Sequence, residues 1–255
     1  MNILSGGPPT APCRLPRVGA CALVLAPLSL SELRAVVFGL SSSPACGEDD
    51  ISIHVFRACF ESIGEMLLHF LNSSIAQSDV LQPWKHSLVH PILKSGALFN
   101  TSNFRPVFIV PVITKILERA VHQQLYSYLS EKHLSPNWHG FRPIPRKPRS
   151  HPYLNHILST SDHGEVTCLY LLDLSKCFDV IGHSKLLSKL PAHEINTSWF
   201  AAYLQNHTQS VTDNHGEIKK SRPLPNNTRV FQSSALGSSS TAFSPTTLVS
   251  LPKAL

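Results

Sequence analysis

The sequence predicts an α+β fold, and three kinds of segment support this prediction. Apolar residues recur at three- and four-residue spacing over residues 29–40 and 111–132, which is typical of amphipathic helices. A short run rich in apolar and β-branched residues at 87–93 predicts a strand. A second apolar run, at 168–172, ends abruptly in the carboxylate of Asp173. We therefore expect a mixed fold built on a sheet that carries Asp173.

The composition sets broad limits on the class of protein. A chain of 255 residues can bury one substantial core or two small ones, and its 20 prolines and serine-rich end indicate much irregular chain. The formal charge of +6 favours a polyanionic partner, although scattered basic residues also fit a basic protein with no such partner. The six cysteines form no CxxC pair, which argues against a zinc site or a disulfide scaffold and favours reduced thiols in the nucleus or cytoplasm.

The first 28 residues predict an irregular leader with some features of a secretory signal. Arg14 and Arg17 precede an apolar segment at 18–28, which is too short to span a membrane. Pro27 interrupts this segment, and no clear small-residue cleavage site follows it. We expect a nuclear or cytoplasmic protein without a membrane partner. A small secreted protein remains an alternative that rests on this segment alone.

Two helices are predicted between residues 29 and 77. Ser29 and Glu32 have the spacing of a capping box, so a short helix begins there. A longer helix follows the polar loop 41–50, and its core-facing residues are expected to be Phe56, Cys59, Phe60, Ile63, Leu67, Phe70 and Leu71. The acidic triplet 48–50 in the loop is interpreted as solvated charge that complements the dipole of the following helix, rather than as a metal site.

A strand, strand, helix module is predicted next. The strand at 87–93 is followed by a turn at 94–96, and Asn103 opens a second strand that includes residues 107–110. Pro111 then begins a helix that runs to about Lys132.

Two histidines at the start of this module raise the question of a metal site. His86 and His90 have the i, i+4 spacing of a helical metal pair, but Pro91 and the β-branched neighbours favour a strand.

Asp173 is the central candidate for a functional residue. The apolar run 168–172 follows a turn at 161–164 and predicts a strand buried on both faces. A carboxylate at the C-terminal end of such a strand can hold a metal ion at the edge of a cleft, which Phe178 would help to wall. A helix N-cap or a turn carboxylate is the alternative interpretation of Asp173.

The remaining chain predicts short elements and a tail. Helices are expected at 183–190 and 197–204, the second with a buried face formed by Trp199, Phe200, Tyr203 and Leu204. Residues 208–211 and 218–224 are expected to pair as a hairpin. The segment 238–255 has no periodicity and predicts disorder.

Several stretches in order resemble the reverse transcriptases of non-LTR retrotransposons, the jockey-like LINE elements. LLDLSKCFD, which contains Asp173, is similar to the first catalytic block of that family. PWKHSLVHPILKSG and NFRPVFIVPVITKILERAVHQQLYSYL resemble its fingers, HGFRP resembles the next finger motif, and SWFAAYLQNHTQSV resembles the segment after the first block. The resemblance covers roughly residues 30–237.

The resemblance implies a partial right-hand polymerase and a role for five residues. Asp173 would be the catalytic Mg²⁺ ligand, and Phe178 would screen the sugar 2′-position. Arg105 and Arg142 would grip the nucleotide triphosphate, although a surface arginine is the alternative for each. Gln232 would belong to a later nucleotide-binding block.

The same resemblance divides the chain into four parts. Residues 1–28 are the leader, 29–165 a fingers-like region, 166–237 a partial palm, and 238–255 the disordered tail.

The sequence also departs from the family pattern. Residues 144–149, IPRKPR, replace the usual small and polar continuation after Arg142, and the block 229–238 lacks glycines at two positions where the family has them. No aromatic-x-Asp-Asp motif follows Asp179. We therefore expect the second half of the palm and the thumb to be missing and the chain as given to be inactive.

Two functions remain open at this stage. The first is an RNA-directed DNA polymerase domain whose partners are an RNA template, a DNA primer and deoxynucleoside triphosphates, with Mg²⁺ as cofactor. The second is a non-catalytic, domesticated remnant that binds RNA through its basic fingers.

Overall fold

The computed structural model describes residues 23–94, 96–97, 99–132, 152–164, 166, 182–212 and 220–226. The chain divides into two compact units, of which the smaller spans residues 135–177 and the larger comprises the rest. The described element of the smaller unit is the helix α5 (Pro152–Asp162). The predicted strand at 168–172 lies outside the described residues.

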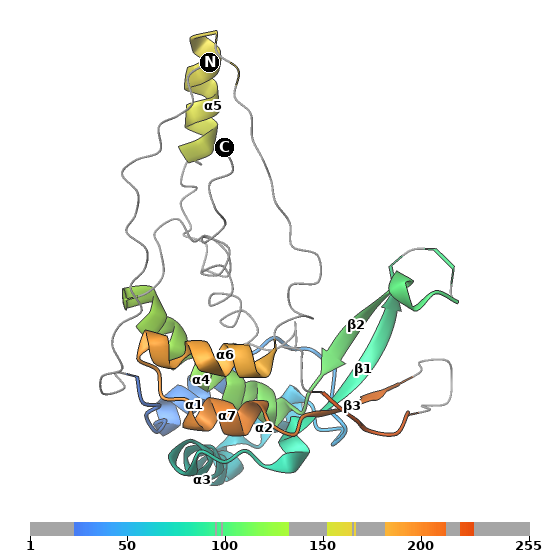
Figure 1. Cartoon of the computed structure of the whole chain (residues 1–255). Coiled ribbons are helices and arrows are strands. Elements are labelled where there is room, and N and C mark those ends of the chain that lie inside the picture. The colour runs from blue at the N-terminus through green and yellow to red at the C-terminus, as the bar shows by residue number, and fades with distance from the viewer. Residues whose placement is uncertain are drawn as a thin grey trace. The chain divides into compact units, whose positions relative to one another are not determined.

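The larger unit combines helices with one sheet (Figure 1). Its α-helices are α1 (Leu30–Gly39), α2 (Ile53–Ala58), α3 (Phe60–Gln77), α4 (Val112–Lys132), α6 (His183–Lys189) and α7 (Ser198–Leu204). Its strands are β1 (His86–Leu93), β2 (Phe104–Ile109), β3 (Thr208–Val211) and β4 (Leu224–Pro225). Short 3-10 turns are η1 (Gln82–Lys85), η2 (Thr101–Asn103) and η3 (Pro191–His193). The α+β prediction is confirmed.

The capping box predicted for α1 is present. The Ser29 hydroxyl accepts a hydrogen bond from the Glu32 amide at 3.3 Å, and the Ser29 amide donates one to Glu32 Oε2 at 2.8 Å. Two amide groups that the first helical turn cannot satisfy are therefore paired. The box fixes the start of α1 and turns Leu33 and Val37 into the core, where both are fully buried.

The single long helix predicted after the polar loop is two helices in the structure. The helical conformation is interrupted at Cys59, which lies between α2 and α3. The side chain of Cys59 is exposed. Phe70 is also exposed, so the predicted core positions of Cys59 and Phe70 were both wrong. Leu71 is fully buried, and one position corresponds to about 100° of rotation around a helix. Phe70 therefore lies beside the buried face of α3 and not on it.

The sheet has the strand order β2-β1-β3-β4. β1 pairs antiparallel with β2, with Ile92 opposite Arg105, and this local pairing confirms the predicted strands at 87–93 and 107–110. On its other edge β1 pairs in parallel with β3, with His86 opposite Thr208. β3 and β4 are antiparallel, as the hairpin prediction requires, but the second strand is only the two residues of β4.

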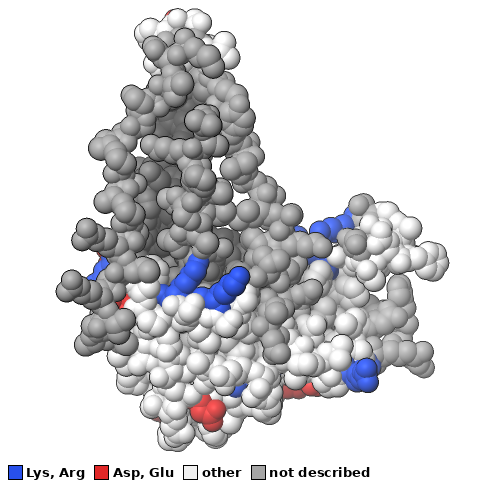
Figure 2. Space-filling view, viewed as in Figure 1, with Lys and Arg blue, Asp and Glu red and all other residues white. Residues whose placement is uncertain are grey.

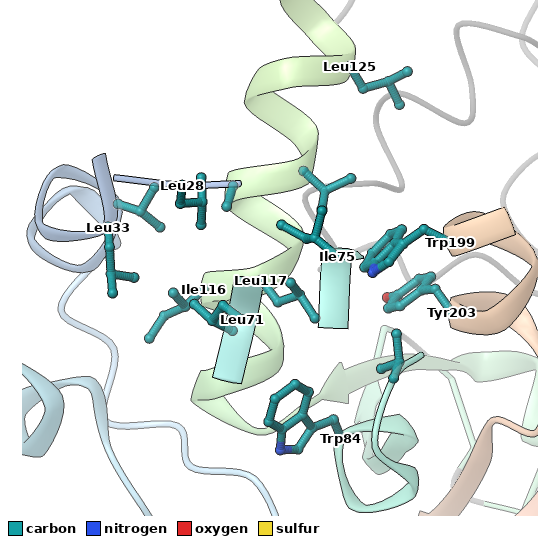
Figure 3. Packing of buried hydrophobic residues seen from close by; sticks show 14 of the residues in the cluster. Leu28, Leu33, Leu71, Ile75, Trp84, Ile116, Leu117, Leu125, Trp199 and Tyr203 are labelled. Atoms are coloured by element: carbon teal, nitrogen blue, oxygen red, sulfur yellow. The ribbon is translucent and has the colours of Figure 1, made fainter. Parts of the chain in front are cut away.

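The hydrophobic core lies among the helices, and α4 crosses its middle (Figure 3). Leu33, Leu71 and Leu117 are fully buried there, while Trp199 of α7 packs against it from another side (Figure 3). Apolar side chains from α1, α2, α3, α4, α6 and α7 fill one continuous cluster, which is the main source of stability expected for this unit. No helix in the described part of the chain is long and apolar enough to cross a membrane.

Candidate functional site

Arg105 is the predicted site residue that the structure describes. It lies on β2 opposite Ile92, in the half of the β1–β2 hairpin nearer to the connecting loop, which we call the outer hairpin. Its side chain is exposed. An exposed guanidinium on a two-stranded support can form bidentate hydrogen bonds with a phosphate that approaches from solvent. The position therefore suits the predicted contact with a triphosphate.

The other four predicted site residues, Arg142, Asp173, Phe178 and Gln232, lie outside the described residues. Their roles remain predictions. Among the residues that are described, no group of three or more histidine, cysteine, aspartate or glutamate side chains gathers in a way that would hold a metal ion.

The parallel pairing of β1 with β3 places two histidines against two threonines. His86 Nδ1 lies 2.8 Å from Thr208 Oγ1, and His90 Nδ1 lies 3.0 Å from Thr212 Oγ1. Both histidines lie in the strand β1, which confirms the prediction made from Pro91 and its β-branched neighbours. Because four residues of a strand span about 13 Å, the two imidazoles cannot share one metal ion. Their polar contacts instead tie β1 to the segment that contains β3.

The acidic triplet of the loop 41–50 contributes one residue to this region. Glu48 Oε2 lies 3.4 Å from His86 Nε2, and Glu48 Oε1 lies 3.7 Å from Lys220 Nζ. Glu48 was predicted to be a solvated charge that complements the dipole of the following helix. This prediction is incomplete, since the Glu48 carboxylate also contacts His86 of the sheet. The exposed pair with Lys220 is expected to add little stability, because water and salt screen it.

The same loop packs closely against the start of α4. A Cβ atom at Gly47 would lie 2.6 Å from the Pro111 Cα, so only glycine permits this approach. Lys115 of α4 donates from Nζ to the Ala45 carbonyl at 3.3 Å. Burial lowers the pKa of Lys115, and nearby Glu118 partly offsets this effect. The loop is thus held on the helix that carries the core.

A buried polar pair joins α4 to α7. The Tyr203 hydroxyl donates to Glu118 Oε1, and Glu118 is only 1% exposed. The Tyr203 ring stacks on Trp199 with a centroid distance of 5.2 Å. Sequence reasoning missed Glu118, although an acid among the apolar helical positions Leu117, Val121 and Leu125 is a signal of a partnered buried charge.

His207 continues the connection from α7 to β3. Its Nε2 lies 2.6 Å from the Tyr203 carbonyl, and its ring meets the Tyr203 ring edge to face at 5.1 Å. Burial lowers the pKa of His207 to about 4, and the charges of His183 and Lys85 act in the same direction. The histidine is therefore neutral at physiological pH and serves as a packed connector between the helices and the sheet.

A cavity of about 500 Å³ lies between α4 and the segment before α1. Gln124 bridges this segment through two bonds with the Ala26 backbone, at 2.8 and 2.9 Å. Glu32 and Glu131 give the cavity an acidic lining. These two carboxylates would repel a phosphate-bearing ligand.

Comparison with known proteins gives a match over much of this region. Residues 92–232 match the family described as reverse transcriptase (RNA-dependent DNA polymerase). The chain is 25% identical over 171 residues to the RNA-directed DNA polymerase from the mobile element jockey of Drosophila melanogaster, covering 66% of this chain and 19% of the relative. It is 23% identical over 189 residues to the retrovirus-related Pol polyprotein from the type-1 retrotransposable element R2 of Popillia japonica, covering 72% of this chain and 25% of the relative. The chain thus spans a fifth to a quarter of the length of these relatives.

Proposed function

Since the chain belongs to the reverse transcriptase (RNA-dependent DNA polymerase) family, we propose that it forms the fingers and first half of the palm of a LINE-type RNA-directed DNA polymerase. The observation that carries this proposal is the extent of the family match. Residues 92–232 include all five residues that the sequence assigns to nucleotide and metal binding: Arg105, Arg142, Asp173, Phe178 and Gln232. The substrates would be an RNA template, a DNA primer and deoxynucleoside triphosphates.

Asp173 is proposed to hold Mg²⁺. Its carboxylate oxygens are hard ligands, which suit this ion, but a single carboxylate cannot by itself hold two metal ions. When bound, Mg²⁺ would polarise the phosphoryl group and neutralise charge on the leaving group. Asp173 would provide the fixed negative charge that orients the ion at the end of its strand.

The two arginines and Gln232 are proposed to position the nucleotide. Arg105 is an exposed residue on β2 and would contact the triphosphate. Arg142 would supply a second planar donor, and the Gln232 amide would hydrogen-bond a nucleotide or the template. Two guanidinium groups fix a phosphate in orientation as well as in place, because each can donate two parallel hydrogen bonds.

Phe178 is proposed to select deoxyribose. An aromatic ring beside the 2′-carbon of the sugar leaves no room for a hydroxyl there, so a ribonucleotide would clash. Replacing Phe178 by alanine should therefore raise the affinity for ribonucleoside triphosphates relative to deoxyribonucleoside triphosphates.

Mg²⁺-dependent binding of a deoxynucleoside triphosphate to the full 255-residue chain with a template-primer tests the proposal, because the chain as given is expected to be inactive in primer extension. We expect Asp173→Ala to weaken the Mg²⁺-dependent binding of the triphosphate and to retain template-primer binding. Asp162→Ala, which changes an acid of α5 away from the proposed site residues in sequence, is the matched control and should bind the triphosphate normally.

Two results would contradict the polymerase proposal. Triphosphate binding that is unchanged in Asp173→Ala would remove this carboxylate from the proposed metal site. A wild-type chain that binds RNA in a salt-sensitive manner but binds no triphosphate in the presence of Mg²⁺ would favour the non-catalytic RNA-binding alternative.

A further inference from the structure

The cavity between α4 and the segment before α1 has walls that are held in place from two helices. Gln124 of α4 bonds the Ala26 backbone through both ends of its side-chain amide. Asn72 of α3 bonds Leu28 in the same way, since its Oδ1 accepts from the Leu28 amide at 2.7 Å and its Nδ2 donates to the Leu28 carbonyl at 2.9 Å. The cavity of about 500 Å³ therefore has fixed walls before any ligand binds, and its size suits a small molecule.

The cavity lining combines an apolar part with two carboxylates. The apolar part comes from the segment before α1 and from α4, and it consists of Ala26, Pro27, Leu28 and Ala120. The carboxylates belong to Glu32 and Glu131. The described surface is mostly white in the view of Figure 2, so charged side chains are sparse on that face, whereas this one cavity has two acids. A ligand that matches the lining has an aliphatic body and positive charge.

The carboxylate of Glu32 is fixed and charged. Its Oε2 accepts from the Ser29 amide at 2.8 Å and from the Ser29 hydroxyl at 2.7 Å. These bonds lower the pKa of Glu32, so its side chain is an anion at neutral pH. Both bonds use Oε2, and Oε1 accepts no hydrogen bond from any described residue, so it is available to a ligand.

The C-terminal end of α4 adds to the negative potential. Glu131 precedes the last residue of this helix, so its carboxylate lies near the negative end of the helix dipole. A cation of the chain itself already uses this wall, because Lys132 Nζ lies 4.9 Å from the centre of the Tyr128 ring, and Tyr128 also lines the cavity. An aromatic face attracts an ammonium group. The wall that contains Tyr128 and Glu131 therefore favours ammonium groups.

A metal ion does not match this lining. Within the described part of the chain, no three histidine, cysteine, aspartate or glutamate side chains lie close enough together to hold one. Mg²⁺ and Ca²⁺ need several oxygen ligands, and the apolar walls of the cavity supply none. The matching cation is consequently an organic one.

We infer that this cavity binds a linear aliphatic polyamine, whose ammonium groups pair with Glu32 and Glu131. Its methylene chain would lie against the apolar wall that includes Pro27 and Ala120. A lysine side chain of a partner protein carries only one ammonium group, so it could not pair with both carboxylates. The inference goes beyond the proposed function and does not depend on it.

Isothermal titration calorimetry of the full 255-residue chain with spermidine tests this inference. Glu131→Gln should weaken binding by about three- to fivefold, which is the effect of losing one solvent-screened ion pair. Glu131 is chosen because Glu32 also belongs to the capping box of α1. Glu65→Gln is the matched control, since Glu65 is an exposed glutamate of α3 outside the cavity, and it should bind spermidine as the wild type does.

Local charge and ligand shape can be tested separately. Lys132→Gln should tighten spermidine binding by about three- to fivefold, because it removes a cation beside Tyr128. Lys94→Gln removes the same charge from the outer hairpin and should leave the affinity unchanged. Hexaamminecobalt(III) has the same charge as spermidine but no methylene chain, so it should bind at least about fourfold more weakly, the effect of burying one methylene group.

Three results would overturn the inference. Equal losses of affinity in Glu131→Gln and Glu65→Gln would assign the binding to general attraction by surface acids. Equal affinities for spermidine and hexaamminecobalt(III) would exclude the contact between the methylene chain and the cavity wall. A wild-type chain that binds no spermidine would exclude the site. These titrations contain no nucleotide or template, so each of the three results leaves the polymerase proposal in place.

Discussion

The helical region and the outer β1–β2 hairpin of the larger unit differ in whether their apolar side chains are buried or exposed. In the helical region, apolar side chains from α1, α3, α4 and α7 bury one another, and Glu118, an acid buried beside them, has a partner. In the outer hairpin, Ile92, Leu93 and Phe99 face solvent, and the sequence between Asp79 and Glu118 contains no acid. In Figure 1 the strands of this hairpin extend away from the helices.

This difference separates residues that stabilise the fold from residues that are available for contact. Burying apolar area stabilises the helical region by about 25 cal/mol for each Å² removed from water. The outer hairpin gains little of this stabilisation because its apolar side chains stay exposed. Substitutions in the two regions should consequently affect different measurements. The four predictions below test that separation, from the largest expected effect to the smallest.

Leu117→Ala should cause the largest loss of stability. Leu117 is fully buried on α4, and removing its side chain leaves a cavity that typically costs about 2–5 kcal/mol in the free energy of unfolding. The matched change in the hairpin, Ile92→Ala, should cost less than about 0.5 kcal/mol because its side chain is half exposed. Urea unfolding followed by circular dichroism measures both, and similar losses would show that the regions do not differ.

Acid should weaken the junction between the helices and the sheet through His207. The pKa of His207 is lowered to about 4 by burial, against about 6.5 in an unfolded chain, so the unfolded state binds the proton more readily. This contribution to stability is complete above pH 6.5 and falls as the pH drops towards 4, by about 3 kcal/mol in total.

Unfolding free energies measured at several pH values between 7 and 4 test this prediction, with His207→Gln as the control. The variant lacks the titrating group, so its stability should fall less steeply over the same range. Parallel curves for the two proteins would show that His207 is not the group responsible.

Tyr203→Phe should destabilise the contact between α4 and α7. The change removes the hydroxyl that donates to the buried carboxylate of Glu118, and a lost hydrogen bond to a charged group costs about 1.5–3 kcal/mol. Tyr126→Phe, at a half-buried tyrosine elsewhere on α4, should change the stability by less than about 0.5 kcal/mol. Equal effects of the two variants in urea unfolding would argue against a special role for the Glu118–Tyr203 pair.

Ser29→Ala should have the smallest of these effects, at the edge of the helical region. It removes one half of the capping box of α1 and should cost about 1 kcal/mol. Ser29→Gly should lose only a few tenths of a kcal/mol, since glycine is itself tolerated at this position. Thermal unfolding of both variants measures the difference, and an alanine variant as stable as the wild type would mean that the cap is dispensable.

The fold was predictable from the sequence where local signals determine it. The capping box at Ser29, the strand at 87–93 and the helix that begins after Pro111 depend on neighbouring residues and are confirmed. The break at Cys59 was missed because the apolar spacing continues smoothly through it. The parallel contact of β1 with β3 was also missed, since nothing near either strand specifies a partner more than 100 residues away.

The candidate site was predicted from motifs rather than from geometry. Arg105 lies exposed on the predicted strand, which agrees with a contact role but does not identify the ligand. Asp173, Phe178, Arg142 and Gln232 lie outside the described residues, so their roles rest on the family match. The cavity beside α4 carried no motif, because its lining comes from segments that are far apart in the sequence.

The parallel pairing of β1 and β3 also has a consequence for synthesis on the ribosome. At a translation rate of about 5–20 residues per second, the roughly 115 residues between the two strands take about 6 to 23 seconds to emerge. The β1–β2 hairpin can form during this interval, but the other edge of β1 has no partner from β3. An open strand edge invites pairing with another nascent chain. The protein is therefore most exposed to aggregation while it is being made, and a chaperone that covers β1 would protect it at that stage.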